Sequence, residues 1–240
     1  MALRSVTLED LRKRVAQAAG IDDLSFVVDT EEGGELDQLI NRSIGEMHDE
    51  LCSIREDYVL EYLELSLTGS SYQLPDDAWQ VRGVDRIESN GEYTPLERQE
   101  WESRGINHSP LDPYITSYVG SSGLPTWNIE GEVIKFFPSS MPPGNVRVTY
   151  VPVAPVLTGS ADTLPKRYVI NGWDEFIDLD AGAKILDKDE SDSTALRSRK
   201  EQIVRRIKAA AHRDATGTRK VQFIRSGWAN RRLRGFVRQI

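Results

Sequence analysis

The sequence predicts an α+β protein in which helices near the N- and C-termini form one helical bundle. An antiparallel β-sheet or barrel portion is inserted into this bundle, and an extended C-terminal tail follows it. Three observations lead to this prediction. Apolar residues recur at helical spacing near both ends, they alternate with period two in the middle, and the tail is strongly basic. We therefore expect N-terminal bundle helices in 1–57, a β-rich portion in 58–156, C-terminal bundle helices in 157–212 and a basic arm in 213–240.

The N-terminal segment predicts two helices that pack together. Thr7 is a capping residue with Asp10 three positions later, and Gly20 ends the first helix. The apolar face of this helix consists of Leu8, Leu11 and Val15. After a polar link with Gly33 and Gly34, a second helix carries the apolar stripe Leu36, Leu39, Ile40, Met47, Leu51 and Ile54. Neither helix buries its own stripe, so we expect each to cover the other.

The apolar period changes to two from Tyr58 onward, which predicts the first strand. A turn-rich segment over 70–77 follows, and we expect it to deliver Trp79 to the edge of the core. Val81–Ile87 reads as the second strand. Asn90 and Gly91 form the strongest hairpin signal of the chain, with the return strand over 93–96. Beyond it we expect one or two helical turns around Trp101 in 97–104 and a short strand at 114–119.

The segment Leu124–Val153 predicts a three-stranded meander. Its first two strands meet at a turn with Glu130 and Gly131, and Pro138 ends the second. A proline-rich link then leads to a strand with a period-two apolar face. The expected core residues are Trp127, Ile129, Ile134, Phe136, Val148 and Tyr150.

Helical periodicity resumes near Tyr168 and continues through Leu186, which predicts one long helix. An acid-rich break over 187–192 separates it from a last helix, Ser193–Ala211. The apolar positions of this last helix are Leu196, Ile203, Val204 and Ile207.

The composition is that of an ordinary globular protein, with 39% hydrophobic and 28% charged residues. No apolar run approaches the ~20 residues that span a bilayer, and the N-terminal segment has no hydrophobic signal core. We therefore expect neither a membrane location nor secretion. Cys52 is the single cysteine, so an internal disulfide is excluded, and we expect it to be a small buried hydrophobe.

No pattern in the chain predicts catalysis. His48, His108 and His212 are scattered without metal-ligand spacing, and the sequence contains no phosphate-binding glycine motif or nucleophile elbow. Carboxylates are abundant, but Asp178 and Asp180 do not share a helix face, and we expect the acids to be solvated on the surface. We predict no catalytic residue, no cofactor and no metal site.

The formal charge of -8 is unevenly distributed. Arg213 to the C-terminus contains eight basic residues and one acid, a charge of +7, so the preceding residues carry -15. A disordered solubilising arm is one interpretation of this tail, but such arms are poor in aromatic residues. Here aromatic residues alternate with arginines, which predicts a partner-binding arm that could reach roughly 90 Å when extended. The predicted contact residues are Arg219, Lys220, Phe223, Arg225, Trp228, Arg231, Arg232, Arg234, Phe236 and Arg238.

The order of local patterns is familiar from one group of viral proteins. The N-terminal helix pair precedes a strand and the turn Leu74-Pro75-Asp76-Asp77. Later patterns are Trp127, Gly131 and Phe136-Phe137-Pro138, then Val146–Tyr150, Leu157-Thr158, Asp162–Pro165 and a closing helix pair. Over about residues 1–212 this order resembles the head-to-tail adaptor (connector) proteins of tailed bacteriophages, in particular the tail tubular protein A-like adaptors of short-tailed phages.

The resemblance implies a virion protein, made in the host cytoplasm, that forms a ring, typically dodecameric, beneath the portal. Such a ring continues the DNA channel without sequence-specific DNA binding and offers a platform for tail tube or nozzle proteins. In related adaptors a C-terminal segment docks onto the portal, a role that the resemblance maps to 213–240. An acidic body suits a channel through which DNA must slide, because neutralised phosphates would bind strongly.

Two other classes of function remain open at this point. The basic arm is compatible with a nucleic-acid-binding protein, although the body is acidic and contains no recognisable helix-turn-helix. An enzyme that uses two carboxylates of the β-rich portion is the third class. A steep salt dependence of DNA binding would identify the second class. The third requires a pH-dependent activity that one acid substitution abolishes.

Overall fold

The computed structural model describes residues 5–21, 23–99, 126–137 and 144–213. The chain divides into two compact units, Met1–Tyr58 with Ala154–Ile240, and Val59–Val153. The first, here called the helical unit, contains the helices of both chain ends, and the second, the β unit, contains all seven strands of the described residues. The predicted α+β class, with a β portion inserted between bundle helices, is therefore confirmed.

The N-terminal helices form where the sequence signals place them. They are α1 (Leu8–Ala19) and α2 (Glu35–Arg55), with a short 3-10 turn, η1 (Leu24–Phe26), in the link. Thr7 and Asp10 form a reciprocal capping box, and Gly20 ends α1 in the left-handed region, at a φ of 69°. Because these signals act within one helical turn, they are readable from the sequence alone.

The C-terminal helices depart from the prediction at one place. The elements are α3 (Lys166–Val169), η4 (Ile170–Gly172), α4 (Glu175–Lys188) and a helix over 194–213, here called the C-terminal helix. The continuous helix expected from Tyr168 is wrong, because Asn171 and Gly172 have φ values of 60° and 72°. These left-handed residues break the helix while the apolar spacing continues across them.

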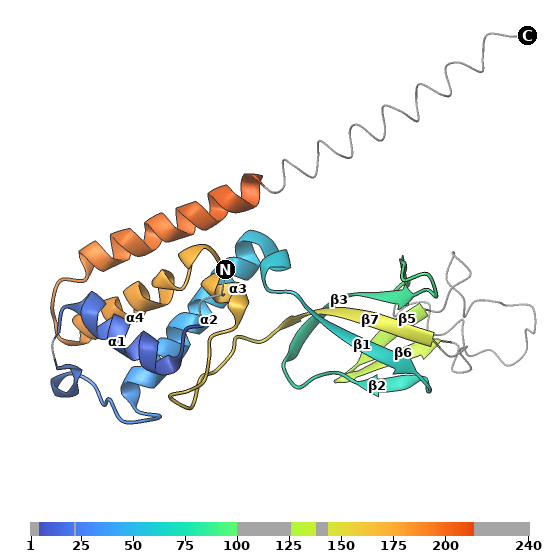
Figure 1. Cartoon of the computed structure of the whole chain (residues 1–240), viewed down its shortest axis with the longest axis horizontal. Coiled ribbons are helices and arrows are strands. Elements are labelled where there is room, and N and C mark those ends of the chain that lie inside the picture. The colour runs from blue at the N-terminus through green and yellow to red at the C-terminus, as the bar shows by residue number, and fades with distance from the viewer. Residues whose placement is uncertain (1–4, 22, 100–125, 138–143, 214–240) are drawn as a thin grey trace, which may run out of the picture. The chain divides into compact units, whose positions relative to one another are not determined.

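Helix α4 is the centre of the helical unit and contacts both α1 and α2 (Figure 1). Its buried positions occupy almost every side of the helix. At Gly182 the packing is so close that a Cβ atom would lie 3.3 Å from Leu196 and 3.4 Å from Ala18. The expected direct packing of α1 on α2 is thus supplemented by a third helix that comes after the β unit in the sequence.

The segment after the β unit is fastened to the N-terminal helices. The amide of Asn41 on α2 both donates to the Leu157 carbonyl and accepts from its N–H, each at 2.8 Å. At the start of α1, the Leu8 N–H donates to the Asp162 carbonyl at 2.9 Å, and Thr7 forms a bridge with Thr163. These contacts join the segment after the insertion to the helices before it, within the helical unit.

The β unit consists of two antiparallel sheets (Figure 1). It follows the 3-10 turn η2 (Glu56–Tyr58). The four-stranded sheet has the order β1 (Glu61–Leu67), β7 (Gly144–Pro152), β3 (Ala78–Ile87), β4 (Tyr93–Pro95). The three-stranded sheet has the order β2 (Ser71–Gln73), β6 (Val133–Phe137), β5 (Thr126–Glu130).

Two hairpins are confirmed and the predicted meander is wrong. Strands β5 and β6 pair across a turn with Gly131 at a φ of 64°, and β3 pairs with β4 across the turn with Gly91 at a φ of 80°. Strand β7 instead lies between β1 and β3 in the other sheet, so β6 and β7 are not neighbours. The link over 138–143 lies outside the described residues. Period-two patterns indicate a strand but do not identify its partner.

The core of the β unit confirms the predicted residues. Trp127, Ile134, Phe136, Val148 and Tyr150 are buried, and Ile129 is half-buried against the same cluster. The remaining buried members of the cluster are Leu67, Leu74, Val81, Val84, Leu96 and Val146.

One local prediction in the β unit is wrong, and a second is contradicted at its first three residues and otherwise lies outside the described residues. Trp79 is 64% exposed instead of lying at the core edge. Its position coincides with an irregularity in the pairing of β3 with β7, between Ala78 and Gln80, where a bulge re-aims the side chains. The expected helix over 97–104 begins instead with an extended segment in which Arg98 bridges to Trp127. Trp101 and the expected strand at 114–119 lie outside the described residues.

Candidate interaction surfaces

All predicted partner-binding residues of the arm lie outside the described residues. They are Arg219, Lys220, Phe223, Arg225, Trp228, Arg231, Arg232, Arg234, Phe236 and Arg238. Their role therefore stays a prediction. The structure does describe the element from which the arm continues, the C-terminal helix, up to residue 213.

The C-terminal helix is held on the helical unit by an apolar side and by ion pairs. Leu196, Ile203, Ile207 and Ala211 are its buried apolar residues. Lys200 lies 2.7 Å from Asp180 on α4, and Lys184 lies 2.5 Å from the other oxygen of the same carboxylate. Glu46 on α2 completes the cluster at 2.9 Å from Lys184. Asp180 thus connects α4 to the C-terminal helix, and both of these helices follow the insertion. Glu46 adds α2, which precedes the insertion.

The lysines around Asp180 favour the ionised form of its carboxyl group. Burial by itself raises the pKa of Asp180, but hydrogen bonds from Lys184 and Lys200 outweigh this effect and lower the pKa below its ordinary value. Asp180 therefore stays ionised at neutral pH although it is only 4% exposed. The two lysines supply the compensating charge that a buried carboxylate requires.

A second buried cluster connects α1 to α4. The Arg14 guanidinium donates to Asp174 at 2.8 Å and to Asp178, and both acids are buried. Burial raises the pKa of Asp178 to about 7, and the charges of Asp174 and Glu175 add to the rise, whereas Arg14 opposes it. The prediction that Asp178 and Asp180 are solvated surface acids is therefore wrong.

A third ion pair fixes α1 against α2. The guanidinium of Arg12 donates from Nε and Nη2 to the two oxygens of Asp37, at 2.7 and 2.6 Å. Asp37 also accepts from the Gly33 N–H at 2.7 Å. Burial raises the pKa of Asp37, but these donors outweigh it and lower the pKa overall. All these acids have close cationic partners, so their chemistry is that of structural ion pairs.

His48 and Cys52 lie close together on α2, whereas His108 lies outside the described residues. His48 lies buried with Nδ1 at 2.6 Å from the Tyr168 hydroxyl, and its Nε2 lies 3.5 Å from the sulfur of Cys52. Cys52 is half-buried, so its predicted full burial is wrong. Within 5–21, 23–99, 126–137 and 144–213, no group of three or more His, Cys, Asp or Glu side chains could hold a metal ion.

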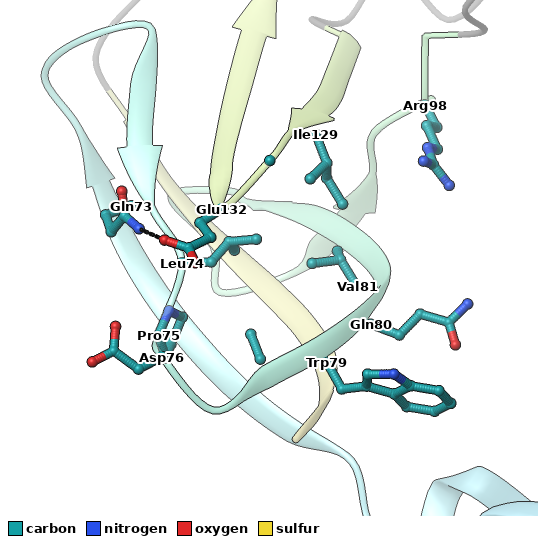
Figure 2. Close-up of a pocket in the computed structure, with 12 residues that line it drawn as sticks. Gln73, Leu74, Pro75, Asp76, Trp79, Gln80, Val81, Arg98, Ile129 and Glu132 are labelled. Carbon is teal, nitrogen blue, oxygen red and sulfur yellow. Dashed lines mark hydrogen bonds between the residues drawn. The ribbon is translucent and has the colours of Figure 1, made fainter. Parts of the chain in front are cut away.

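The β unit has an open hollow of about 260 Å³ beside Trp79 (Figure 2). Leu74, Val81 and Ile129 form its apolar centre. The polar and aromatic side chains around them are Gln73, Asp76, Trp79, Gln80, Arg98 and Glu132. Gln73 donates to Glu132 at 3.1 Å. An exposed indole beside a small apolar floor is typical of a protein contact, because such residues supply much of the affinity of interfaces.

A second exposed feature lies on the four-stranded sheet. The Arg147 guanidinium lies 3.7 Å from the ring centre of Tyr93 and 4.9 Å from that of Tyr62. It also lies 3.3 Å from Asp85. The two tyrosines are 46% and 59% exposed. The sequence pattern did not predict this cluster, because its members come from four strands whose pairing is decided by the fold.

The described surfaces thus suit assembly with other proteins. None of the helices in the part of the chain that the structure describes has the length and apolar character needed to cross a membrane. No curated protein matches the chain. One family model, SU10 adaptor protein, matches residues 6–222. This match includes both units and ends within the basic arm, at residue 222.

Proposed function

The chain belongs to the SU10 adaptor protein family of phage adaptors, and from this premise we propose that it forms a ring between the portal and the tail. The ring, a dodecamer in this proposal, extends the DNA channel and docks tail tube or nozzle proteins. The observation that carries the proposal is the length of the family match, which runs through both units. A match to one unit alone would support only a shared module.

Contacts between helices from before and after the insertion hold the helical unit together, which suits a stable ring subunit. The chain enters the β unit after Tyr58 and returns to the helical unit at Ala154. The ion pairs of Arg14 with the buried acids Asp174 and Asp178 then join helices from both sides of the insertion. Exposed aromatic residues, Trp79 and Tyr62, remain available in the β unit for neighbouring proteins. We assign these surfaces to contacts with tail proteins or with neighbouring copies.

The basic arm is the portal anchor in this proposal. It continues from the C-terminal helix, and its arginines and aromatic residues suit pairing with acids and insertion into apolar pockets. Deletion of 217–240 is the direct test, with binding of the purified chain to the portal ring of the same phage as the measurement. We expect the deletion to abolish stable binding, and undiminished binding would refute the anchor.

Ring formation is tested separately by native mass spectrometry and electron microscopy of the chain, alone and mixed with portal. We expect a closed ring of copies of the 27.1 kDa chain at least when portal is present. A monomer under both conditions would contradict the proposal. DNA passes through the channel without sequence-specific contacts in this proposal, so tight, salt-dependent binding of duplex DNA would favour the nucleic-acid-binding alternative.

A further inference from the structure

The C-terminal helix has two exposed flanks, and they differ in whether their arginine and lysine side chains form ion pairs. On one flank, Lys208 lies 3.1 Å from Glu50, Arg205 lies 3.4 Å from Glu201, and Arg197 contacts Asp187. The other flank carries Arg199, Arg206 and Arg213, all exposed. Among the described residues, none of these three arginines has an ion-pair partner within 4.0 Å.

The spacing of the three arginines places them in one row. A separation of seven residues is almost two full helical turns, so the row drifts by only about 20° per step and advances about 10 Å. The exposed residues between the arginines on this flank are small or uncharged: Ala195, Gln202 and Ala209. We call this flank the arginine row. It contains no acid that could neutralise it, and small neighbours allow a partner to approach closely.

A hollow of about 350 Å³ lies at the Arg213 end of the arginine row. Its apolar wall consists of Tyr58, Ile170, Trp173 and Ala210, and its polar lining consists of Arg167, Asn171 and Arg213. The rings of Tyr58 and Trp173 meet edge to face, with centres 5.1 Å apart, and Ile170 is 48% exposed. A row of cations that ends at a hollow with an apolar wall combines the two elements of a protein-docking site, charge complementarity and an anchor pocket.

We propose that the arginine row and this hollow together dock an acidic segment of the protein that the arm binds. The inference rests on the proposed function, in which that protein is the portal. Carboxylates spaced along the segment pair with the arginines, because a guanidinium binds a carboxylate through two parallel hydrogen bonds. An apolar side chain of the segment enters the hollow. The docking surface in this inference therefore extends along the C-terminal helix from Arg199 to Arg213.

The charge and chemistry of the surroundings favour a protein over nucleic acid. Residues 1–212 carry a charge of -15, and the resulting long-range repulsion is stronger for a duplex, with its dense phosphate charge, than for a few spaced carboxylates. Single arginines about 10 Å apart, with alanine and glutamine between them, also differ from the dense cationic patches that neutralise a phosphate backbone. The hollow adds apolar surface that phosphates do not use.

The test compares two full-length double variants that change the net charge equally. R199E/R206E reverses the arginine row, whereas R205E/K208E reverses the paired flank of the same helix. Binding to the isolated portal ring is measured for both at low and moderate salt, and thermal unfolding verifies that both remain folded. We expect R199E/R206E to weaken portal binding about tenfold or more, and R205E/K208E less than about threefold.

A third variant, Ile170→Ser, tests the hollow, and we expect weaker portal binding that does not depend on salt. Equal weakening by the two double variants, or none by R199E/R206E, would overturn the inference. Loss of duplex DNA binding by R199E/R206E with intact portal binding would also overturn it, in favour of nucleic acid. If the arm deletion abolishes portal binding while R199E/R206E does not, the proposed function survives without this inference. A wild-type chain that does not bind portal would refute both.

Discussion

Arg14 on α1 contacts the buried carboxylate of Asp178 on α4, although the two residues are separated by the whole β unit in the sequence. The contact connects the first helix of the chain to a helix formed after the insertion. Asp174 shares the same guanidinium. This pair of acids with one cation makes the helical unit sensitive to pH.

The first prediction concerns that pH dependence. The pKa of Asp178 rises from 3.8 to about 7 on folding, so the folded state binds more protons than the unfolded state between these pH values. The contribution of Asp178 to the free energy of unfolding therefore falls as the pH rises from about 4 to about 7, by roughly 4 kcal/mol at most. Urea unfolding at pH 5 and pH 8 measures it. In Asp178→Asn this pH-dependent part of the free energy of unfolding should disappear. Parallel pH profiles for the variant and the wild-type protein would contradict the raised pKa of Asp178.

The second prediction concerns Asp180. Its removal in Asp180→Ala leaves Lys184 and Lys200 with only Glu46 as an acidic partner, so we expect a loss of about 3 kcal/mol in the free energy of unfolding. Glu201→Ala is the matched control, because its pair with Arg205 is exposed and worth less than about 1 kcal/mol. Similar losses for both variants would show that the buried cluster has no special role.

The third prediction concerns the capping box of α1. Thr7→Ala removes the acceptor for the Asp10 N–H and should destabilise the helical unit by about 1 kcal/mol. Thr7→Ser keeps the hydroxyl and should cost less. The two variants are compared by chemical denaturation, and indistinguishable midpoints would refute a capping contribution.

The fourth prediction contrasts two glycines of the bundle helices. Gly182→Leu inserts a side chain where Leu196 and Ala18 already lie within 3.4 Å of a Cβ position, so we expect a loss of about 1–3 kcal/mol or more. Gly45 on α2 has open space around its Cβ position. Gly45→Ala should therefore stabilise the helix by about 0.5–1 kcal/mol. Thermal melts of the two variants should shift in opposite directions, and shifts of the same sign would contradict the packing.

The fifth prediction contrasts two tryptophans of the β unit. Trp127 is 3% exposed and donates from Nε1 to the Leu96 carbonyl at 3.0 Å, so Trp127→Ala should cost about 3–5 kcal/mol. Trp79→Ala should change the stability by less than about 0.5 kcal/mol, because its ring is exposed. A large stability loss in Trp79→Ala would show that its role is in folding and would remove it from the candidate interaction surfaces.

The sequence by itself determined the elements whose signals are local. The capping box at Thr7, the apolar stripe of α2 and the β5–β6 hairpin with Gly131 each depend on residues within a few positions of one another. The order of these local patterns resembles the phage adaptors, and the family match over residues 6–222 confirms this resemblance. The basic arm was also visible as composition, and its contact residues remain a prediction because they lie outside the described residues.

Only the tertiary structure decided which elements became neighbours. Strand β7 joins β1 and β3, although the sequence places it directly after β6, because pairing is chosen by packing of the whole β unit. Asp178 and Asp180 became buried because α4 is covered on several sides, and their compensating cations come from α1, α4 and the C-terminal helix. A single-helix pattern contains no information about such partners. Long-range contacts therefore decide where charge is buried, and local patterns decide where helices and hairpins begin.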